Sequence, residues 1–216
     1  MYEYMDSRLK SVKKKLETEF AHLGAMGFDA LNVVNTRKLT KQMYDRLLTN
    51  NEAAYLRVAK NAYKEARKRA TGMGYSGDEE TEITGDWLFT ILLGYNLVTG
   101  YLYDKEAERK RLRLNEQILT AREFGDRDMY RNSLRKSMNL WWTQTQQYGI
   151  EVVDETTIQA YMDAGVDKVR WVTTLDERTC EVCRKRNNKI YDIARVPAKT
   201  HYACRCRLEP VEIEEE

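Results

Sequence analysis

The first part of the chain is amphipathic with a helical period. Its apolar side chains recur at intervals of three or four residues, and lysines and glutamates occupy most positions between them. Such intervals place side chains on one face of an α-helix. The apolar positions are Met5, Leu9, Val12, Leu16 and Phe20. The pattern predicts a helix, ended near Gly24 and Gly27, whose apolar face packs against this chain or a neighbouring molecule.

Two further helices are predicted between residues 36 and 72. The first is capped by Thr36 or Thr40 and is expected to stop at 50–51, where two asparagines adjoin. The second is rich in alanine, the strongest helix former, and is expected to run from Glu52 to Gly72 with lysines and arginines on its outer side.

A polar stretch at 72–85 precedes the most apolar segment of the chain. Its four glycines and four acidic residues predict a mobile loop or a boundary. Asp86 is expected to cap the apolar segment 87–98, which we interpret as the most buried helix of the fold. Interrupted by Gly94 and Asn96, this segment is too short and too polar to span a membrane.

Helical patterns continue in the second half of the chain. A charged helix is predicted over 104–124, with a break at Gly125. A stripe of apolar residues predicts a helix over 128–149, closed by the glycine at its end. Asp154 is expected to cap a shorter helix that ends at Gly165, so the two form a helix pair joined by a short turn.

Near the C-terminus the helical period gives way to alternation. Val169, Trp171 and Thr173 alternate with Arg170 and Val172, which predicts a β-strand, and a second strand is expected over 189–193. The predicted fold class is therefore mainly α, with a small C-terminal α+β zinc-knuckle module. The expected regions are a helical N-terminal region over 1–125, a module over 126–208 and an acidic tail over 209–216.

Composition is typical of a helix-rich soluble protein, with 42% hydrophobic residues, 32% charged residues and only two prolines. Thirty-six basic residues against 34 acidic ones give a formal net charge of +2, so overall charge favours no class of partner. Basic residues are nevertheless concentrated over 37–70 and 176–208. We interpret these blocks chiefly as solvated faces, and the alternative is a surface that meets a polyanion or an acidic protein.

All four cysteines lie in one C-terminal stretch with the spacing of a metal site. The stretch reads Cys180-x2-Cys183, then His201-x2-Cys204-x-Cys206. Zinc takes four thiolate or imidazole ligands at about 2.0–2.3 Å, and Cys-x2-Cys lets two sulfurs of one turn reach a single ion. In extended chain, Cys204 and Cys206 would point to the same side. The spacing predicts a structural Zn²⁺ ion held by four of these five side chains.

Two disulfides, or free thiols, are the alternatives to a metal. The first fifteen residues are charged and contain no apolar segment of a secretory signal, so a reducing compartment and a metal are favoured. The metal is expected to be structural, because a closed thiolate-rich shell leaves no open position for water. We rank Cys180 and Cys183 first as ligands, then Cys204, with His201 and Cys206 competing for the last place.

A longer motif around the cysteines resembles that of a known family. It reads Trp171-x-Thr173-x2-Asp176-x-Arg178-Thr179-Cys180-x2-Cys183, followed by His201-x2-Cys204-Arg205-Cys206. This motif is similar to the signature of the Mu F-like phage head morphogenesis, or minor capsid, family, over roughly residues 127–208. Tyr202 stands where the family typically has proline, and only Glu155 remains of an upstream Arg-Thr-Glu. Asn188 replaces a common glycine, and because asparagine tolerates left-handed backbone, the turn is expected to persist.

The resemblance implies a minor head protein of a tailed phage or prophage, acting in head morphogenesis near the portal and in DNA packaging or ejection. The implied partners are the portal or major capsid protein, with non-specific contact to packaged DNA and no membrane. The implied location is the head interior of the virion, and the host cytoplasm during assembly. The sequence contains no phosphate-binding loop or hydrolase motif, so no enzymatic activity is expected. The alternative function is a zinc-dependent nucleic-acid-binding module, motivated by the two basic stretches.

Three further residues of the motif are expected to support the metal site. A carboxylate at Asp176 can accept backbone N–H groups, and Arg178 can pair with it or reach backbone carbonyls. We assign both, together with Trp171, a structural role next to the metal rather than a catalytic one.

Overall fold

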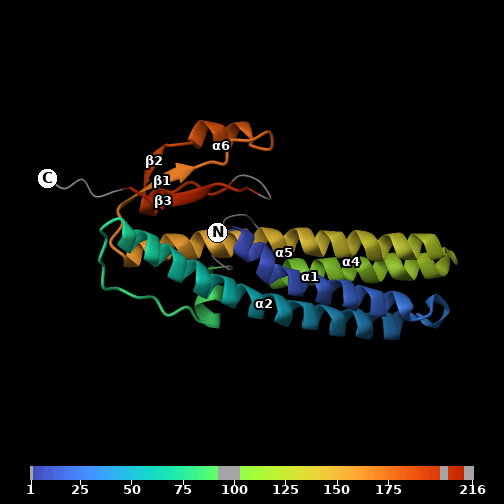
Figure 1. The fold of residues 1–216 in the computed structure, drawn as a ribbon. Coiled ribbons are helices and arrows are strands. Elements are labelled where there is room, and N and C mark those ends of the chain that lie inside the picture. Colours follow the sequence, from blue (N-terminus) through green and yellow to red (C-terminus); the bar gives the residue numbers. More distant parts are fainter. Residues whose placement is uncertain (1, 92–102, 200–203, 212–216) are drawn as a thin grey trace. The chain divides into compact units, whose positions relative to one another are not determined.

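The structure is a computed structural model that describes residues 2–91, 103–199 and 204–211. Long helices dominate, and a three-stranded antiparallel sheet follows them (Figure 1). The helices are α1 (Tyr2–Ala25), α2 (Val33–Gly72), α4 (Tyr103–Glu123), α5 (Arg127–Asp163) and the short α6 (Glu181–Arg186), and the strands are β1 (Lys168–Val172), β2 (Ile190–Asp192) and β3 (Arg207–Pro210). The predicted fold class, mainly α with a small C-terminal α+β part, is confirmed.

The chain forms two compact units. Unit 1 contains residues 1–5, 56–88 and 149–216, and unit 2 contains residues 6–55 and 89–148. Both units take segments from either side of residue 125, because α2 and α5 each contribute to both. These units are defined by contacts within the fold and do not test the predicted regions. The division of the sequence into 1–125, 126–208 and 209–216 stays a prediction.

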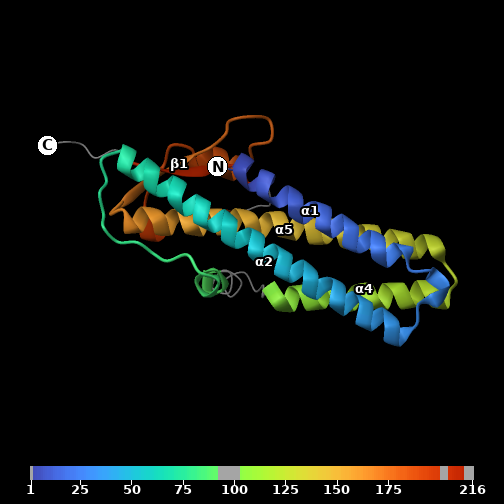
Figure 2. The same cartoon turned by 60° about the horizontal axis from the view of Figure 1, so that its bottom comes forward.

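Unit 2 is a helical bundle. Segments of α1, α2, α4 and α5 run side by side in it (Figures 1 and 2). The predicted apolar face of α1 is confirmed from Leu9 onward, since Leu9, Val12, Leu16 and Phe20 are all at most 4% exposed. The main apolar cluster is formed by Leu16, Phe20, Leu23, Phe28, Leu31, Met43, Tyr44, Leu47, Ala107, Leu114, Ile118, Ala121, Tyr130, Leu134 and Trp141.

Helix α2 does not stop at the two asparagines, so the predicted break is wrong. Asn32 caps its start, because the side-chain oxygen accepts the N–H groups of Val34 and Asn35 at 3.0 Å. The helix then continues for 40 residues. Asn51 is 1% exposed and its amide donates to the Thr145 hydroxyl at 3.0 Å. Burial and this bond outweigh the propensity cost of asparagine, which is below about 1 kcal/mol.

Helix α5 is likewise continuous for 37 residues, where the sequence predicted a helix pair. Gly149 costs about 1 kcal/mol relative to alanine in a helix, but the positions around it are buried and packing holds the helix together. Asp154 lies inside the helix and not at the start of a separate one, so the predicted cap is wrong. The predicted end is confirmed: Gly165 has a φ of 77°, and the N–H of Val166 donates to the carbonyl of Tyr161, as in a Schellman motif.

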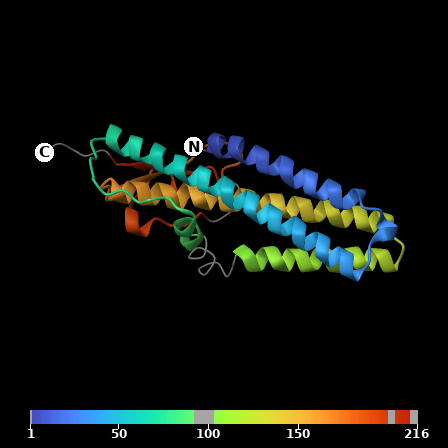
Figure 3. The same ribbon diagram turned by 90° about the horizontal axis from the view of Figure 1, so that it is seen from below.

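The loop over 73–84 is present as predicted, and in unit 1 it is tied to its surroundings. It leaves the end of α2 and passes beside the end of α5 (Figure 3). The N–H of Gly77 donates to the Ala164 carbonyl, and the Thr81 N–H donates to Asp163 at 2.8 Å. A Cβ at residue 77 would lie 2.5 Å from the Ala164 backbone, so only glycine allows this approach.

The helix after this loop begins two residues earlier than predicted. Residues 85–91 are helical, and the Thr84 hydroxyl accepts the N–H of Trp87 at 3.1 Å, so Thr84 rather than Asp86 is the cap. In the described part Leu88 is buried and Phe89 is 51% exposed. The rest of the predicted buried helix, 92–98, lies outside the described residues. None of the described helices combines the length and apolarity that crossing a membrane would require.

The sheet has the order β2-β1-β3, with both neighbours antiparallel to the central strand. Strands β1 and β2 were predicted, and β3 was not. Arg170 lies opposite Ile190 on one side and Glu209 on the other, which fixes the register. Val169, Trp171 and Leu208 are buried while their neighbours Arg170 and Arg207 are exposed. Cys204 and Cys206 lie directly before β3.

Candidate metal centre

The first cysteine pair is placed by α6, a six-residue helix that the sequence did not predict. Cys180 is the residue before the helix, and its sulfur accepts the N–H of Cys183 at 3.3 Å. Cys-x2-Cys therefore spans the first turn of a helix instead of a simple tight turn. Asn188 follows with a φ of 62°, so the left-handed turn expected there is confirmed.

The second pair lies directly before β3 in chain that alternates like a strand. Cys204 and Cys206 are 1% and 3% exposed, and Arg205 between them is exposed. Period-two alternation therefore puts both sulfurs on the buried side, as the sequence predicted. We refer to residues 166–211, which contain all four cysteines, as the cysteine module.

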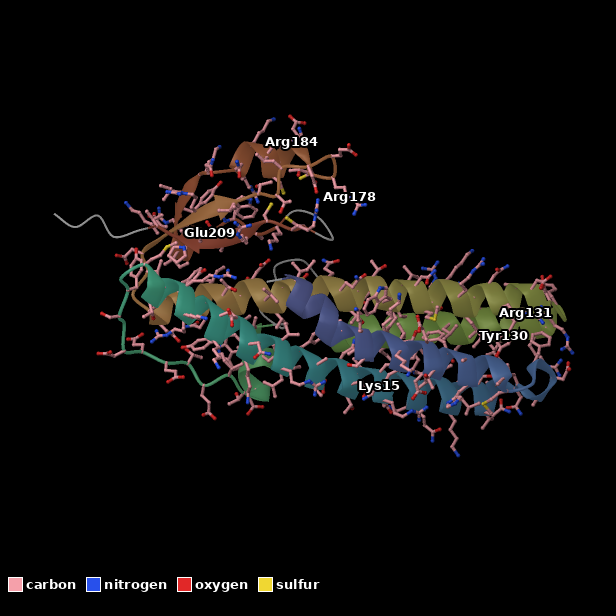
Figure 4. All side chains as sticks on the ribbon, viewed as in Figure 1. Lys15, Tyr130, Arg131, Arg178, Arg184 and Glu209 are labelled. Atoms are coloured by element: carbon pink, nitrogen blue, oxygen red, sulfur yellow. The ribbon has the colours of Figure 1, made fainter. Side chains whose placement is uncertain are left out.

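Three of the predicted ligands come together. The sulfurs of Cys183, Cys204 and Cys206 lie within 4.8 Å of one another, and those of Cys183 and Cys204 are 3.6 Å apart. None of the four cysteines forms a disulfide, and all four line a small cavity of about 20 Å³. Figure 4 shows sulfur atoms gathered in this region near the labelled Arg178. His201, the fifth candidate, lies outside the described residues.

This arrangement suits a metal ion. Two sulfurs bound to one tetrahedral zinc ion at about 2.3 Å are about 3.8 Å apart, close to the Cys183–Cys204 separation. The three buried cysteines lie close enough together to hold an ion, and thiolates are ligands that zinc prefers. The residues present therefore fit a thiolate-bound metal.

The thiols differ in their tendency to ionise. Burial raises the pKa of Cys183 to about 12. A hydrogen bond between Cys204 and Cys206 raises the pKa of Cys204 and lowers that of Cys206 to about 5. Cys206 is thus the group of the cluster that most readily becomes a thiolate, and a metal would have to displace protons from the others.

Trp171 and Thr173, which lie in β1 and directly after it, are next to the cysteine cluster. The Thr173 hydroxyl donates to the carbonyl of Cys183 at 3.0 Å and lies 3.4 Å from the sulfur of Cys206. Trp171 is 2% exposed, and its indole N–H makes no hydrogen bond to the described residues although it helps to lower the pKa of Cys206. A buried N–H beside an anionic sulfur again suits a metal-bound thiolate.

Asp176 organises the turn that leads into Cys180. Its carboxylate accepts the backbone N–H of Arg178 and the hydroxyl of Thr179, and it forms an ion pair with Arg205 at 2.6 Å. The hydrogen bond from Arg205 is the main reason that the pKa of Asp176 is lowered. Arg178 is exposed and lines the cavity, so the arginine that pairs with Asp176 is Arg205.

A partly buried ion pair joins the module to α5. The ammonium group of Lys199 is 2.7 Å from the carboxylate of Asp154 on α5, and the two side chains are 11% and 21% exposed. Burial lowers the pKa of Lys199 to about 7 and raises that of Asp154. Burial therefore opposes charge on both groups, while their contact favours it.

Sequence reasoning missed four residues around the centre. Thr179 could have been found, because a threonine three residues after an aspartate is typical of a side-chain-capped turn. Arg205 lies between two ligands, and its exposed position follows from alternation. Asp154 and Lys199 are 45 residues apart, and no local pattern joins them.

Comparison with known protein families finds a similarity over part of the chain. Residues 141–209 match the family described as phage Mu protein F like protein. No curated protein and no solved structure is significantly similar to the chain. The matched range contains the second part of α5, the sheet and all four cysteines. Over residues 141–209 the chain is therefore similar to the phage Mu protein F like family.

Proposed function

We propose that this protein is a head morphogenesis protein of a tailed phage or prophage. The observation that carries the proposal is that the family match covers the cysteine module from Val166 to Glu209, including all four cysteines. Within that role we assign it to the minor head proteins near the portal, where it acts in DNA packaging or ejection. Its function is structural, and no catalytic step is assigned to it.

The proposed role of the cysteine module is to bind one structural Zn²⁺ ion. Cys183, Cys204 and Cys206 would hold it, with Cys180 or His201 as the fourth ligand. The ion would supply folding free energy to a module with few apolar residues. Elemental analysis of the purified, reduced chain tests this proposal, and less than one equivalent of metal per chain would contradict it.

The proposed partners are the portal or major capsid protein and, non-specifically, packaged DNA. For DNA the support is a stripe of cations on α2 at intervals of three and four residues, which shares one helix face. Arg57, Lys60, Lys64 and Lys68 form it. All four are exposed, and none forms an ion pair with a described residue. Phosphate contacts through this stripe would weaken steeply as salt is added.

Quantitative mass spectrometry of purified particles tests the assembly role. The expected result is a few copies per particle, retained after the particle is purified away from host proteins. Absence from virions and also from assembly intermediates would contradict the proposal. Particles that lack the protein should then show a defect in head assembly or DNA content, and normal infectious particles would argue against any such role.

A further inference from the structure

Thr173 lies where the sheet meets the cysteine cluster. It directly follows β1, and Cys206 directly precedes β3. In the β1–β3 pairing Val172 lies opposite Arg207, so the next pair along this register is Thr173 and Cys206. Side chains that lie directly opposite each other in an antiparallel pair project from the same face and are neighbours. The register therefore accounts for the 3.4 Å between the Thr173 hydroxyl oxygen and the Cys206 sulfur.

Thr173 also contacts the other half of the cysteine cluster, which α6 carries. Its hydroxyl donates to the Cys183 carbonyl at 3.0 Å, and its backbone N–H donates to the side-chain oxygen of Asn187 at 3.0 Å. Thr173 is 7% exposed and lines the same cavity as all four cysteines. One buried threonine thus bridges the two segments whose cysteines would bind the same ion.

The hydrogen bonds that Thr173 can form depend on whether Cys206 is bound to a metal ion. A hydroxyl group has one proton to donate, and it can also accept. A thiol at Cys206 can donate to the hydroxyl oxygen while the hydroxyl donates to the Cys183 carbonyl. A metal-bound thiolate has no proton and can only accept. The hydroxyl proton then has two acceptors, and the sulfur is favoured because hydrogen bonds to ionised groups are about twice as strong as neutral ones.

We propose that Thr173 is a positioning residue of the metal centre. Its hydroxyl group donates to the sulfur of Cys206 when that sulfur is bound to the ion, and so fixes this ligand relative to the half of the site that α6 carries. Hydrogen bonds of this kind orient a ligand and raise the affinity of the site for its metal. This inference rests on the metal-binding function proposed above.

The test compares full-length variants that differ in one hydroxyl group. Thr173→Val keeps the branched shape of the side chain and removes the hydroxyl, whereas Thr173→Ser keeps the hydroxyl. Zinc affinity, measured by competition with a chromophoric chelator, should fall about 10- to 100-fold in Thr173→Val, the usual effect of removing a group that supports a ligand. Thr173→Ser should retain most of the affinity. An equal loss in both variants would overturn the inference, because the hydroxyl would not be the cause.

A second measurement separates a hydrogen bond to the sulfur from general support of the fold. Cobalt(II) in place of zinc gives a charge-transfer band from its thiolate ligands, and the energy of this band depends on the hydrogen bonds that the sulfurs accept. At saturating cobalt(II) the band should move to lower energy in Thr173→Val, because a sulfur that accepts no hydrogen bond holds its electrons less tightly. In Thr173→Ser the band should keep its wild-type position.

Thr174 provides the matched control. It is the neighbouring threonine and lines the same cavity, but it is exposed. Its backbone carbonyl accepts the N–H of Asp176 at 3.1 Å, and a change of side chain leaves that carbonyl in place. Thr174→Val should therefore change neither the zinc affinity nor the cobalt band. Circular dichroism should show that the helices persist in every variant.

The possible failures can be told apart. A wild-type chain that binds neither zinc nor cobalt contradicts the proposed function as well as this inference. A wild-type chain that binds zinc, with unchanged affinity in Thr173→Val, overturns this inference alone. So does a lowered affinity with an unmoved cobalt band, because Thr173 would then only stabilise the fold. If Thr173→Val does not fold, a crystal structure of the zinc-bound wild-type chain decides the question: a Thr173 oxygen within hydrogen-bond distance of the Cys206 sulfur supports the inference, and one beyond it overturns the inference.

Discussion

The bundle of unit 2 and the cysteine module bury very different side chains. The bundle surrounds a large apolar cluster with leucines and aromatic residues from all its helices. In the described part of the cysteine module, the buried hydrophobic residues are only seven, and three of them are cysteines: Val166, Val169, Trp171, Cys183, Cys204, Cys206 and Leu208. A region with so small an apolar core needs another source of stability, such as a bound metal. The comparison teaches that burial of apolar side chains stabilises the bundle, whereas the module would be stabilised by the metal ion proposed above.

Removal of the metal should produce the largest difference in stability between the bundle and the cysteine module. We expect chelation, or Cys183→Ser, to unfold the cysteine module while the bundle helices persist. A structural zinc ion contributes about 10–16 kcal/mol in zinc-finger peptides, which is as large as the stability of a whole domain. Limited proteolysis should show new cleavage between 166 and 211, and circular dichroism should retain most of the helical signal.

Val182→Ser is the control for this experiment. Residue 182 lies on the same short helix and is 42% exposed, so its substitution should leave protection unchanged. Full protection of the module in a Cys180→Ser/Cys183→Ser variant would show that no structural metal is bound there.

Truncation of a side chain in the bundle core should have the second largest effect. It should destabilise the bundle and not the cysteine module. Leu47 and Ile118 are 0% exposed, and replacement of either by alanine should lower the free energy of unfolding by about 2–5 kcal/mol. Zinc affinity should not change. Chemical denaturation provides the measurement, with Leu112→Ala as control, because Leu112 is 53% exposed and its loss should cost little. An equal loss at residue 112 would mean that burial does not stabilise the bundle.

Gly77→Ala should have an intermediate effect, confined to unit 1. The new methyl group would lie 2.5 Å from the Ala164 backbone, so the loop has to move. We expect a loss of about 1–3 kcal/mol and faster hydrogen exchange at residues 77 and 81, whose N–H groups donate to α5 and the turn after it. Gly72→Ala, with nothing within 4 Å of the new atom, should be neutral or stabilising. Unchanged exchange in Gly77→Ala would contradict the close approach.

The smallest effect is expected for an ion pair at the bundle surface. A hydrogen bond from Arg46 lowers the pKa of Glu19, and Arg46 is 55% exposed, so solvent screening limits the pair to about 0–1 kcal/mol. A group whose pKa is lowered in the folded state stabilises the protein at pH values above its unfolded-state pKa. This contribution is lost as the pH falls through the folded-state pKa. Glu19→Gln should therefore be less stable than wild type at neutral pH, and equally stable once Glu19 is protonated. A difference that persists in acid would show that the glutamine disturbs packing instead.

Local sequence patterns predicted the helices in which apolar residues recur over many positions, and two of the strands. The face of α1, the helix α4 and the end of α5 at Gly165 follow from apolar spacing and glycine chemistry. Local patterns failed at Asn51 and Gly149, because contacts with distant residues bury these positions and outweigh weak helix propensity. They also missed α6, whose six residues make fewer than two helical turns, and β3, whose sequence Arg-Leu-Glu-Pro has no β-branched or aromatic residue and ends in proline.

For the candidate metal centre, the spacing of the cysteines predicted that they form one site, but it did not predict which residues surround them. Alternation predicted that Cys204 and Cys206 share a side, since that depends only on backbone geometry. The pairing of Asp176 with Arg205 and of Asp154 with Lys199 depends on how the chain returns to itself, which no local pattern contains.

The strict in-and-out order from Cys204 to Pro210 has a consequence for sequence change in this protein. The exposed position of Arg207 can accept many other residues, because its side chain does not line the sulfur cavity, whereas Arg205 lines the cavity and pairs with Asp176. An insertion or deletion of a single residue there would turn every following side chain to the opposite face. Evolution of this segment is therefore expected to preserve the number of its residues more strictly than their identities.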